Sequence, residues 1–330
     1  MKIAGLLVAL TAALNLTTSA AISESLKTES STGLASARAV SPVQFPGLCR
    51  FPLGDFQITT LSDGTCSLDL HELLLGASVS EVDFLLDKQC LHNPVEASVN
   101  SFLIQTGTKN ILVDTGAGQL FGPKVCGKLL ESLMVAGLKP EQIDDILITH
   151  VHTDHSGGLM RDGRMLFPNA TIHVGKPDVD FFLDSSNSEK TGYGIKYFES
   201  AQKTLKPYVD AGKVKTFSGI LEILPGITAT LHPGHTPGSA FYLVKSKDQS
   251  IQFLGDVIHC SAVQMPRPDI TIKFDVDSTK AAKVRSEELA HFAKDKQMIA
   301  APHLPFPGIG YVQAEGKGYR WIPKEYRNRE

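Results

Sequence analysis

The chain has 330 residues and a formal net charge of −3, with 42% hydrophobic and 20% charged residues. This composition excludes an intrinsically disordered protein and a small disulfide-bonded scaffold. The length is sufficient for one large hydrophobic core or two modest ones. Lysine and arginine together number 32 against 35 aspartates and glutamates, so the charge does not favour a nucleic-acid partner.

The N-terminal sequence is predicted to lie outside the folded domain. Residues 1–20 combine a positive charge, an apolar run over 3–16 and small residues at the end, which is the pattern of a cleaved signal peptide. A membrane-spanning helix needs ~20 strongly apolar residues, and this run is shorter. Residues 21–44 are rich in Ser, Thr and Ala and predict a flexible leader. We therefore expect a secreted or periplasmic protein with one folded domain over 45–330.

The five cysteines are scattered without a Cys-x-x-Cys pair, which argues against a cysteine-based zinc knuckle. Export permits disulfides, and the odd count leaves at least one thiol unpaired while every pairing stays open. Asn169-Ala170-Thr171 is a glycosylation sequon, which matters only in a eukaryotic host.

The hydrophobic patterns after residue 45 predict strands and helices in both halves of the chain. In the first half we expect strands over 56–61, 98–105, 110–113 and 145–149, and a helix over 124–136. In the second half we expect helices over 179–184, 195–209 and 279–296, and strands over 227–231, 240–244, 251–254 and 298–301. Two strand-rich halves that each carry helices suit a mixed α/β fold, built as a four-layered αββα sandwich.

One short segment carries most of the chemical information. Residues 149–158 read THVHTDHSGG, which places three histidines and one aspartate within six positions. His150 and His152 follow a predicted strand, where extended backbone turns side chains two residues apart to the same side. Asp154 and His155 then lie on the turn into the next helix. Imidazole and carboxylate groups bind zinc and similar divalent ions, and burying them without a metal is costly.

Three further candidate ligands each end a predicted strand, namely His235, Asp256 and His303. Taken singly, each has an ordinary alternative as a hydrogen-bonded residue at a strand end. Together with the cluster they make seven groups, too many for one tetrahedral zinc but suited to two ions that share a bridge. The histidines without partners in sequence are expected at the surface: His71, His92, His173 and His291.

These motifs resemble the two-metal form of the metallo-β-lactamase superfamily, and within it the methyl parathion hydrolase group, which is related to lactonases. The similarity runs from about Leu53 to Tyr326. Its markers are Leu53–Phe56, Leu61–Thr65, Val113–Gly116, Leu120–Pro123, Phe167–Ala170, Phe306–Gly310 and Ala314–Arg320. The resemblance implies the αββα metallo-β-lactamase sandwich and a hydrolase domain over 45–330.

The resemblance also implies a cofactor of two divalent metal ions, with Zn²⁺ the expected ion. The implied sets are His150, His152 and His235 for one ion, Asp154, His155 and His303 for the second, and Asp256 as the bridge. Asp114 matches a position that supports the metal loops from outside the ligand set, where such partners orient imidazoles.

The expected chemistry follows from the charge of the ions. A bound divalent ion lowers the pKa of water to about 7, and two ions ~3.5–4 Å apart share the resulting hydroxide. We expect this bridging hydroxide to attack a carbonyl or phosphoryl centre, while Asp154 orients it or passes a proton to the leaving group. The sequence contains no Gly-x-Ser-x-Gly elbow, phosphate loop or dinucleotide fingerprint.

The resemblance implies aromatic walls around the metal centre. The matching positions are Phe121, Phe182 and Tyr197, with His259 and Phe274 nearby, and ordinary core packing is the alternative for each. Three positions depart from the family pattern: Phe182 stands for a tryptophan, Tyr197 for a phenylalanine and His259 for a leucine. The pocket is therefore expected to be more polar, which favours lactones or esters and leaves phosphotriesters as a side activity.

The leading prediction is a dinuclear zinc hydrolase that opens a small lactone or ester. A thioesterase of the glyoxalase II kind is one alternative, and it would need a cationic surface that the motifs do not show. A β-lactamase is disfavoured by the acidic bridge in place of a cysteine ligand. A non-catalytic metal-binding protein is the alternative from another class. The expected partner is a small-molecule substrate, without nucleic acid or membrane, and the resemblance makes a homodimer an open alternative.

Overall fold

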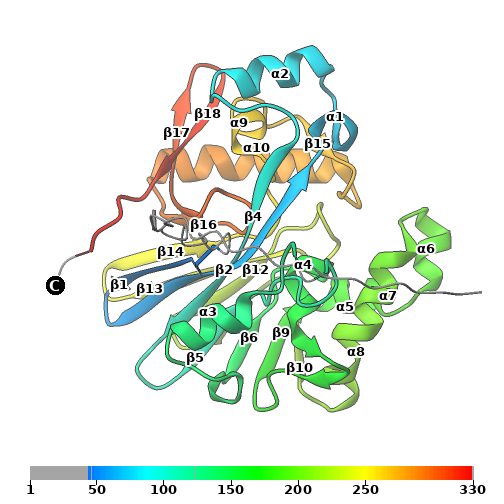
Figure 1. Cartoon of the computed structure of the whole chain (residues 1–330), viewed down its shortest axis with the longest axis vertical. Helices are drawn as coiled ribbons and strands as arrows, with labels where there is room; N and C mark the ends of the chain where they lie inside the picture. The colour runs from blue at the N-terminus through cyan, green and yellow to red at the C-terminus, as the bar shows by residue number, and fades with distance from the viewer. Residues whose placement is uncertain (1–43, 46, 123, 329–330) are drawn as a thin grey trace, which may run out of the picture. The chain divides into compact units, whose positions relative to one another are not determined.

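Figure 1 shows the computed structural model, which describes residues 44–45, 47–122 and 124–328. The predicted signal peptide and the predicted leader up to residue 43 lie outside these residues. The compact unit of the chain runs from Phe45 to Glu330. Within the described part of the chain, every helix falls short of the length or apolarity needed to cross a bilayer.

The first sheet has seven strands in the order β1-β2-β4-β5-β6-β9-β10. They are β1 (Leu48–Leu53), β2 (Phe56–Leu68), β4 (Val95–Gln105), β5 (Asn110–Val113), β6 (Asp145–Leu147), β9 (Thr171–Gly175) and β10 (Val214–Phe217). The strands from β5 to β10 run parallel, so the carboxyl ends of β5 and β6 reach the same edge of the sheet. The strands predicted over 56–61, 98–105 and 110–113 are confirmed, the first two with longer bounds.

The second sheet also has seven strands, in the order β11-β12-β13-β14-β16-β17-β18. They are β11 (Ile220–Leu224), β12 (Ile227–Leu231), β13 (Ala240–Ser246), β14 (Gln249–Phe253), β16 (Ile299–Ala300), β17 (Ile309–Glu315) and β18 (Gly318–Pro323). The parallel pair β14 and β16 directs two carboxyl ends to one edge. The four strands predicted in this half are confirmed, whereas the β17–β18 hairpin was not expected. Two small pairs complete the strands: β3 (Leu74–Leu75) with β15 (Thr271–Ile272), and β7 (Met160–Arg161) with β8 (Arg164–Met165).

Helices cover the outer faces of both sheets. On the first sheet lie α3 (Leu129–Val135), α5 (Lys176–Phe182), α7 (Ile195–Thr204) and α8 (Lys206–Asp210). On the second lies α10 (Ser278–Asp295), beside a smaller cluster of α1 (Leu70–Leu73), α2 (Val79–Asp87) and α9 (Ser261–Gln264). The short helices α4 (Thr153–Ser156) and α6 (Ser186–Thr191) and the 3₁₀ turns η1 (Pro140–Gln142) and η2 (Gly157–Leu159) complete the set. Figure 1 shows α10 and α3 on opposite sides of the two sheets.

The core between the sheets joins side chains of both, such as Ile58 and Phe102 from the first and Tyr242 and Phe253 from the second. The rings of Phe102 and Phe253 meet edge to face with centroids 5.2 Å apart. This central layer and the two helical layers confirm the predicted αββα sandwich.

The helices predicted over 179–184 and 279–296 are α5 and α10, and the strand predicted over 145–149 is β6, each with slightly shifted bounds. Two other predicted helices differ more. The helix expected over 124–136 begins at Leu129, because Asp63 accepts hydrogen bonds from the backbone of Gly127 and Leu129 and holds the preceding residues in a turn. The helix expected over 195–209 is divided into α7 and α8. Pro207 lies at the start of α8, where its missing N–H costs nothing, whereas inside a longer helix it would break a hydrogen bond.

The prediction that His173 lies at the surface was wrong. His173 is buried on β9, and its Nε2 lies 2.7 Å from Asp145 Oδ1 on the neighbouring strand β6. The partner is distant in sequence, so the pattern around His173 did not reveal it. All five cysteines carry free thiols.

Close packing explains the two glycines that follow the histidine cluster. Gly157 has an ordinary helical φ of −62°, so it is not required by the turn itself. A Cβ on Gly157 would lie 2.3 Å from the carbonyl oxygen of Ala117, and one on Gly158 would lie 2.0 Å from that of Thr115. The glycines therefore let the chain after β5 pass directly against the metal-ligand candidates.

We predict that Gly158→Ala lowers the free energy of unfolding by about 1–3 kcal/mol, since the added methyl must displace a backbone. Urea denaturation measures the effect. Gly194→Ala is the matched control, because its Cβ would meet the Tyr197 ring at an ordinary 3.6 Å. A Gly158→Ala protein as stable as the control would contradict this packing.

Candidate metal centre

The candidate ligands meet because each follows the carboxyl end of a strand. His150 follows β6 of the first sheet. His235, Asp256 and His303 follow β12, β14 and β16 of the second sheet. The sandwich brings these strand ends to one edge, so residues far apart in sequence face one another. His152 caps the short helix α4, which carries Asp154 and His155.

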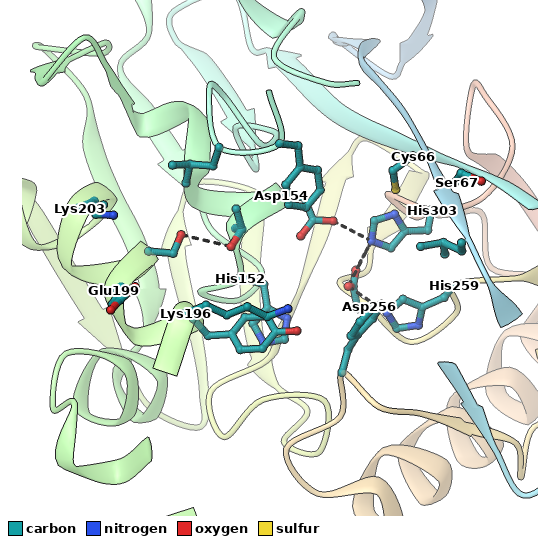
Figure 2. Close-up of a pocket in the computed structure, with 17 residues that line it drawn as sticks. Cys66, Ser67, His152, Asp154, Lys196, Glu199, Lys203, Asp256, His259 and His303 are labelled. Atoms are coloured by element: carbon teal, nitrogen blue, oxygen red, sulfur yellow. Dashed lines mark hydrogen bonds and ion pairs between the residues drawn. The ribbon is translucent and has the colours of Figure 1, made fainter. Parts of the chain in front are cut away.

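Asp256 stands at the centre of the cluster. Its Oδ1 lies 3.2 Å from His155 Nε2 and 3.1 Å from His303 Nε2. Its Oδ2 lies 3.6 Å from His150 Nε2 and 3.4 Å from His235 Nε2. One carboxylate therefore faces imidazoles on both of its sides. Figure 2 shows the contacts that run from Asp154 through His303 to Asp256 and His259, with His152 on the other side of the pocket.

The ligand atoms fall into groups that could each hold one ion. In each group these atoms lie within 4.8 Å of one another. The groups are His150, His152, His235 and Asp256; Asp154, His155 and His303; and Asp256, His259 and His303. The first two match the division that the family resemblance implies, and Asp256 lies beside both. All seven predicted ligands are brought together.

The outward nitrogens of three histidines are held by carboxylate or carbonyl oxygens. His155 Nδ1 lies 2.8 Å from Asp114 Oδ2, and His235 Nδ1 lies 2.8 Å from Asp275 Oδ1. His303 Nδ1 lies 2.8 Å from the carbonyl oxygen of Ser98, which can only accept a hydrogen bond. Each Nδ1 therefore donates its proton outward, and each Nε2 faces Asp256 as the atom that would bind a metal. Burial alone would lower the pKa of these three histidines, but the neighbouring aspartates outweigh it and raise that pKa, so Nε2 must give up a proton when a metal binds.

His152 has the opposite tautomer, with its proton on Nε2. The Tyr193 hydroxyl donates its proton to the carbonyl oxygen of Phe274, at a distance of 2.7 Å. In its other contact, with His152 Nε2 at 2.8 Å, the hydroxyl oxygen therefore accepts, so His152 carries its proton on Nε2. His152 Nδ1 is then the free atom, 3.1 Å from His150 Nε2 and 3.0 Å from His235 Nε2. Sequence reasoning missed both Tyr193 and Asp275, because neither lies near the motifs.

Asp114 lies where the sequence placed it, beneath the cluster. Its carboxylate accepts hydrogen bonds from the backbone N–H and the hydroxyl of Thr149 at 2.8 and 2.7 Å, as well as holding His155. Its φ of +57° is in the left-handed region, which is uncommon outside glycine and fits a residue constrained by these contacts.

Two buried atoms show that the cluster fits cations. His155 Nε2 and Asp256 Oδ1 have no hydrogen-bond partner among the described residues, although both are buried. Leaving such atoms unpaired is costly, and a cation between them would satisfy both. The donor set consists of imidazole nitrogens and carboxylate oxygens, which suits Zn²⁺ and similar divalent ions.

Burial and neighbouring charges set the protonation states of the candidate ligands. Burial and the neighbouring imidazoles lower the pKa of His150 and His152 well below its usual range, so both are neutral, the form that binds metals. Burial alone would raise the pKa of Asp256, but His155 and His303 outweigh it and hold that pKa well below its usual range. The Asp256 carboxylate is therefore ionised in the buried site.

A third aspartate outside the cluster joins the two histidine loops. Asp178 on α5 is buried and accepts hydrogen bonds from Val151 N and Thr236 Oγ1, both at 2.9 Å, and from Gly238 N. Burial raises the pKa of Asp178 to about 6. The sequence signal was weak, because one aspartate in a helix is normally exposed.

A cavity of about 490 Å³ opens over the cluster. It is lined by four of the five predicted pocket residues, Phe121, Tyr197, His259 and Phe274. Phe182 is different, because α5 directs it into the core, where it is fully buried. Its ring packs edge to face behind the ring of His152, with centroids 5.6 Å apart. Phe182 therefore supports a candidate ligand instead of lining the pocket.

His259 is buried on the cavity wall. Its Nε2 lies 3.2 Å from Asp256 Oδ2, but neither ring nitrogen makes a geometrically proper hydrogen bond to the described residues. This sets it apart from His155, His235 and His303, whose Nδ1 atoms are all held. A buried imidazole without such a support is able to turn a nitrogen toward a molecule in the cavity.

Comparison with known proteins identifies the family. The profile of the metallo-beta-lactamase superfamily matches residues 95–290. The chain belongs to this superfamily.

Among curated relatives, exodeoxyribonuclease WalJ of Streptococcus pneumoniae is 32% identical over 168 residues, which cover 50% of this chain and 52% of the relative. N-acyl homoserine lactonase of Bacillus cereus is 25% identical over 181 residues, which cover 49% of this chain and 64% of the relative. The chain thus spans only about half to two thirds of the length of these relatives.

Two solved structures match most of the chain. The hydrolase AbOPH of the beta lactamase superfamily is 37% identical, with a TM-score of 0.82, covering 87% of this chain and 100% of that one. AidC, a dizinc quorum-quenching lactonase with a bound product, is 28% identical, with a TM-score of 0.78, covering 86% of this chain and 99% of that one.

We predict that Asp178→Asn lowers the free energy of unfolding by about 1–3 kcal/mol, because the amide nitrogen cannot accept all three hydrogen bonds. The two histidine loops should separate, so bound metal should also fall. Asp180→Asn is the control, since that carboxylate is exposed and pairs only with Lys176 on the surface. Chemical denaturation and metal analysis measure both variants, and equal behaviour of the two would contradict the proposed link.

Proposed function

We propose that this chain is a metal-dependent hydrolase with two divalent ions, Zn²⁺ being the expected metal, that opens a small lactone or ester. Organophosphate triesters are proposed as side substrates. One observation carries the proposal: the buried Asp256 carboxylate faces imidazoles on both sides at the floor of a cavity with largely apolar walls.

The ions, when bound, would supply a hydroxide nucleophile near neutral pH and polarise the bond under attack. The residues of the chain would hold the ions, orient the nucleophile and transfer protons. His150, His152 and His235 would hold one ion, and Asp154, His155 and His303 the other, with Asp256 between them.

Asp154 is the candidate for proton transfer. It is half-buried and lines the cavity, whereas the other six candidate ligands are buried. Its Oδ2 lies 3.4 Å from His303 Nε2, so it contacts the cluster and the cavity together. A carboxylate in this position can hold the nucleophile in line and pass a proton to the leaving group.

The cavity supports a small, partly apolar substrate. Its volume of about 490 Å³ lies in the range of small-molecule sites, and apolar side chains of Leu68, Phe121 and Phe274 line it. These surfaces suit an acyl chain or an aryl ring, while the imidazole of His259 offers a polar contact near the floor. The lactonases among the relatives support a lactone as substrate.

The alternatives make different demands on the cavity. A thioester on a carrier or a DNA strand would need a cationic surface for its phosphates. In this cavity Lys196 and Lys203 are accompanied by Glu199, Asp154 and Asp256, so positive charge does not dominate. Export of the protein and a hydrolase domain over 45–330 remain predictions from the sequence.

The proposal is tested by a substrate panel on protein whose metal content has been measured. The panel holds dihydrocoumarin, an N-acyl homoserine lactone, methyl paraoxon, an acyl thioester and single-stranded DNA, each with and without a chelator. We expect the lactones to turn over fastest and a chelator to abolish the activity. Bound metal without any turnover would favour a non-catalytic metal-binding protein, and preference for the thioester or DNA would replace the lactone proposal.

We predict that Phe274→Ala raises KM for aryl substrates by about 10-fold. The substrate's ring would lose its contact with the Phe274 ring, which is worth roughly half of the free energy of burying one apolar side chain. Metal content should stay unchanged, since Phe274 is outside the ligand groups. Phe84→Ala, at an exposed position on α2, is the control. Steady-state kinetics with metal analysis decide the matter, and an unchanged KM would show that this wall does not touch the substrate.

A further inference from the structure

We propose that Arg285 is a positioning residue of the metal centre, which acts on His235 through Asp275. This inference rests on the proposed function only in requiring that the cluster binds metal. Arg285 lies on α10, outside the candidate ligand groups, and its side chain is fully buried.

The guanidinium of Arg285 holds both ends of the loop that joins the bridge candidate to the outer partner of His235. Its Nε donates to the carbonyl oxygen of Val257, the residue after Asp256, at 2.5 Å. Its Nη1 donates to the carbonyl oxygens of Pro268 and Ile270 at 3.0 and 2.7 Å. The planar fork thus fixes the chain that follows Asp256 against the chain that leads to Asp275.

The remaining nitrogen of the fork faces Asp275. Arg285 Nη2 makes no hydrogen bond within the described residues and lies 4.0 Å from Asp275 Oδ2. The other oxygen, Asp275 Oδ1, lies 2.8 Å from His235 Nδ1. Asp275 is therefore placed between a permanent cation and the imidazole of a candidate ligand, and both side chains of the ion pair have no exposure.

Physical considerations separate positioning from simple support of the fold. Apolar side chains often replace a buried ion pair without loss of stability, so such a pair is weak evidence for a stabilising role. A carboxylate behind a metal-ligating imidazole fixes its orientation and raises its basicity. Arg285 holds that carboxylate in place, because among the described residues Asp275 Oδ2 otherwise has only the N–H of Ile272, at 3.2 Å, to hold it.

The two roles predict different losses of metal. If Arg285 acts through Asp275, its removal weakens chiefly the ion beside His150, His152 and His235. The ion beside Asp154, His155 and His303 should be affected less, since those residues have other outer partners. A residue that only supports the fold would weaken both ions together, in proportion to the loss of stability.

The test measures the binding of Zn²⁺ and Co²⁺ to the full chain by chelator competition, with the visible spectrum of the Co²⁺ protein as a second readout. Arg285→Met and Asp275→Asn should each weaken one ion by about 10–100-fold and alter the spectrum, while the second ion keeps nearly its wild-type affinity. The double variant should be no weaker than Asp275→Asn alone, because both changes act through His235. Arg285→Lys keeps the positive charge but not the planar fork of donors, so its affinity for the affected ion should lie between those of wild type and Arg285→Met.

Arg267→Met is the matched control, because this arginine lies on the loop that Arg285 holds but pairs with Asp269 at 2.6 Å and with Glu81, and it is partly exposed. Wild-type affinity for both ions in Arg285→Met, equal weakening of both, or additive effects in the double variant would overturn the inference. If Arg285→Met does not fold, Asp275→Asn and Arg285→Lys decide the question by the same readouts. Wild-type protein that binds two ions yet hydrolyses nothing would refute the proposed function and leave this inference standing.

Discussion

The fold depends on a buried negative charge at the place where the two sheets meet. Asp256 is ionised without solvent, and it is tolerated there because imidazoles from both sheets surround it. Such a charge is costly unless it is paired, and a pair of cations would satisfy it more completely than the imidazoles do. Strand ends from the two sheets converge at this point, and beside it the chain after β5 packs so closely that Gly157 and Gly158 have no room for a side chain.

Hydrogen bonds behind the candidate ligands make this arrangement specific. The outward Nδ1 atoms of His155, His235 and His303 each donate to an oxygen, so the Nε2 atoms that face Asp256 are fixed in position before any ligand arrives. His152 is fixed in the opposite tautomer by Tyr193. His259 lacks such a support, although its Nε2 also lies 3.2 Å from Asp256 Oδ2. Arg285 extends the network one step further from the centre.

The sequence was sufficient for the parts of the site that are local or that end strands. The spacing of His150, His152, Asp154 and His155 gave the cluster, because their geometry follows from a strand and a turn. The partners Asp275, Tyr193 and Asp178 could not be predicted, since each lies 27 or more positions from the residue of the site that it holds, on a helix or loop that no motif marks. Phe182 was misplaced for the same reason: an aromatic residue near a site packs in the core or lines the pocket according to the direction of its helix. The late start of α3 at Leu129 depended on Asp63, whose hydrogen-bond partners are also distant in sequence.

The most direct test of the central claim is anomalous diffraction near the zinc absorption edge on crystals of the metal-loaded chain. The account predicts two peaks on either side of the Asp256 carboxylate, about 3.5–4 Å apart. Each peak should lie within about 2.0–2.3 Å of imidazole nitrogens, with His152 binding through Nδ1 and His155, His235 and His303 through Nε2. A single peak, peaks away from Asp256, or a loaded protein without metal at the cluster would contradict it.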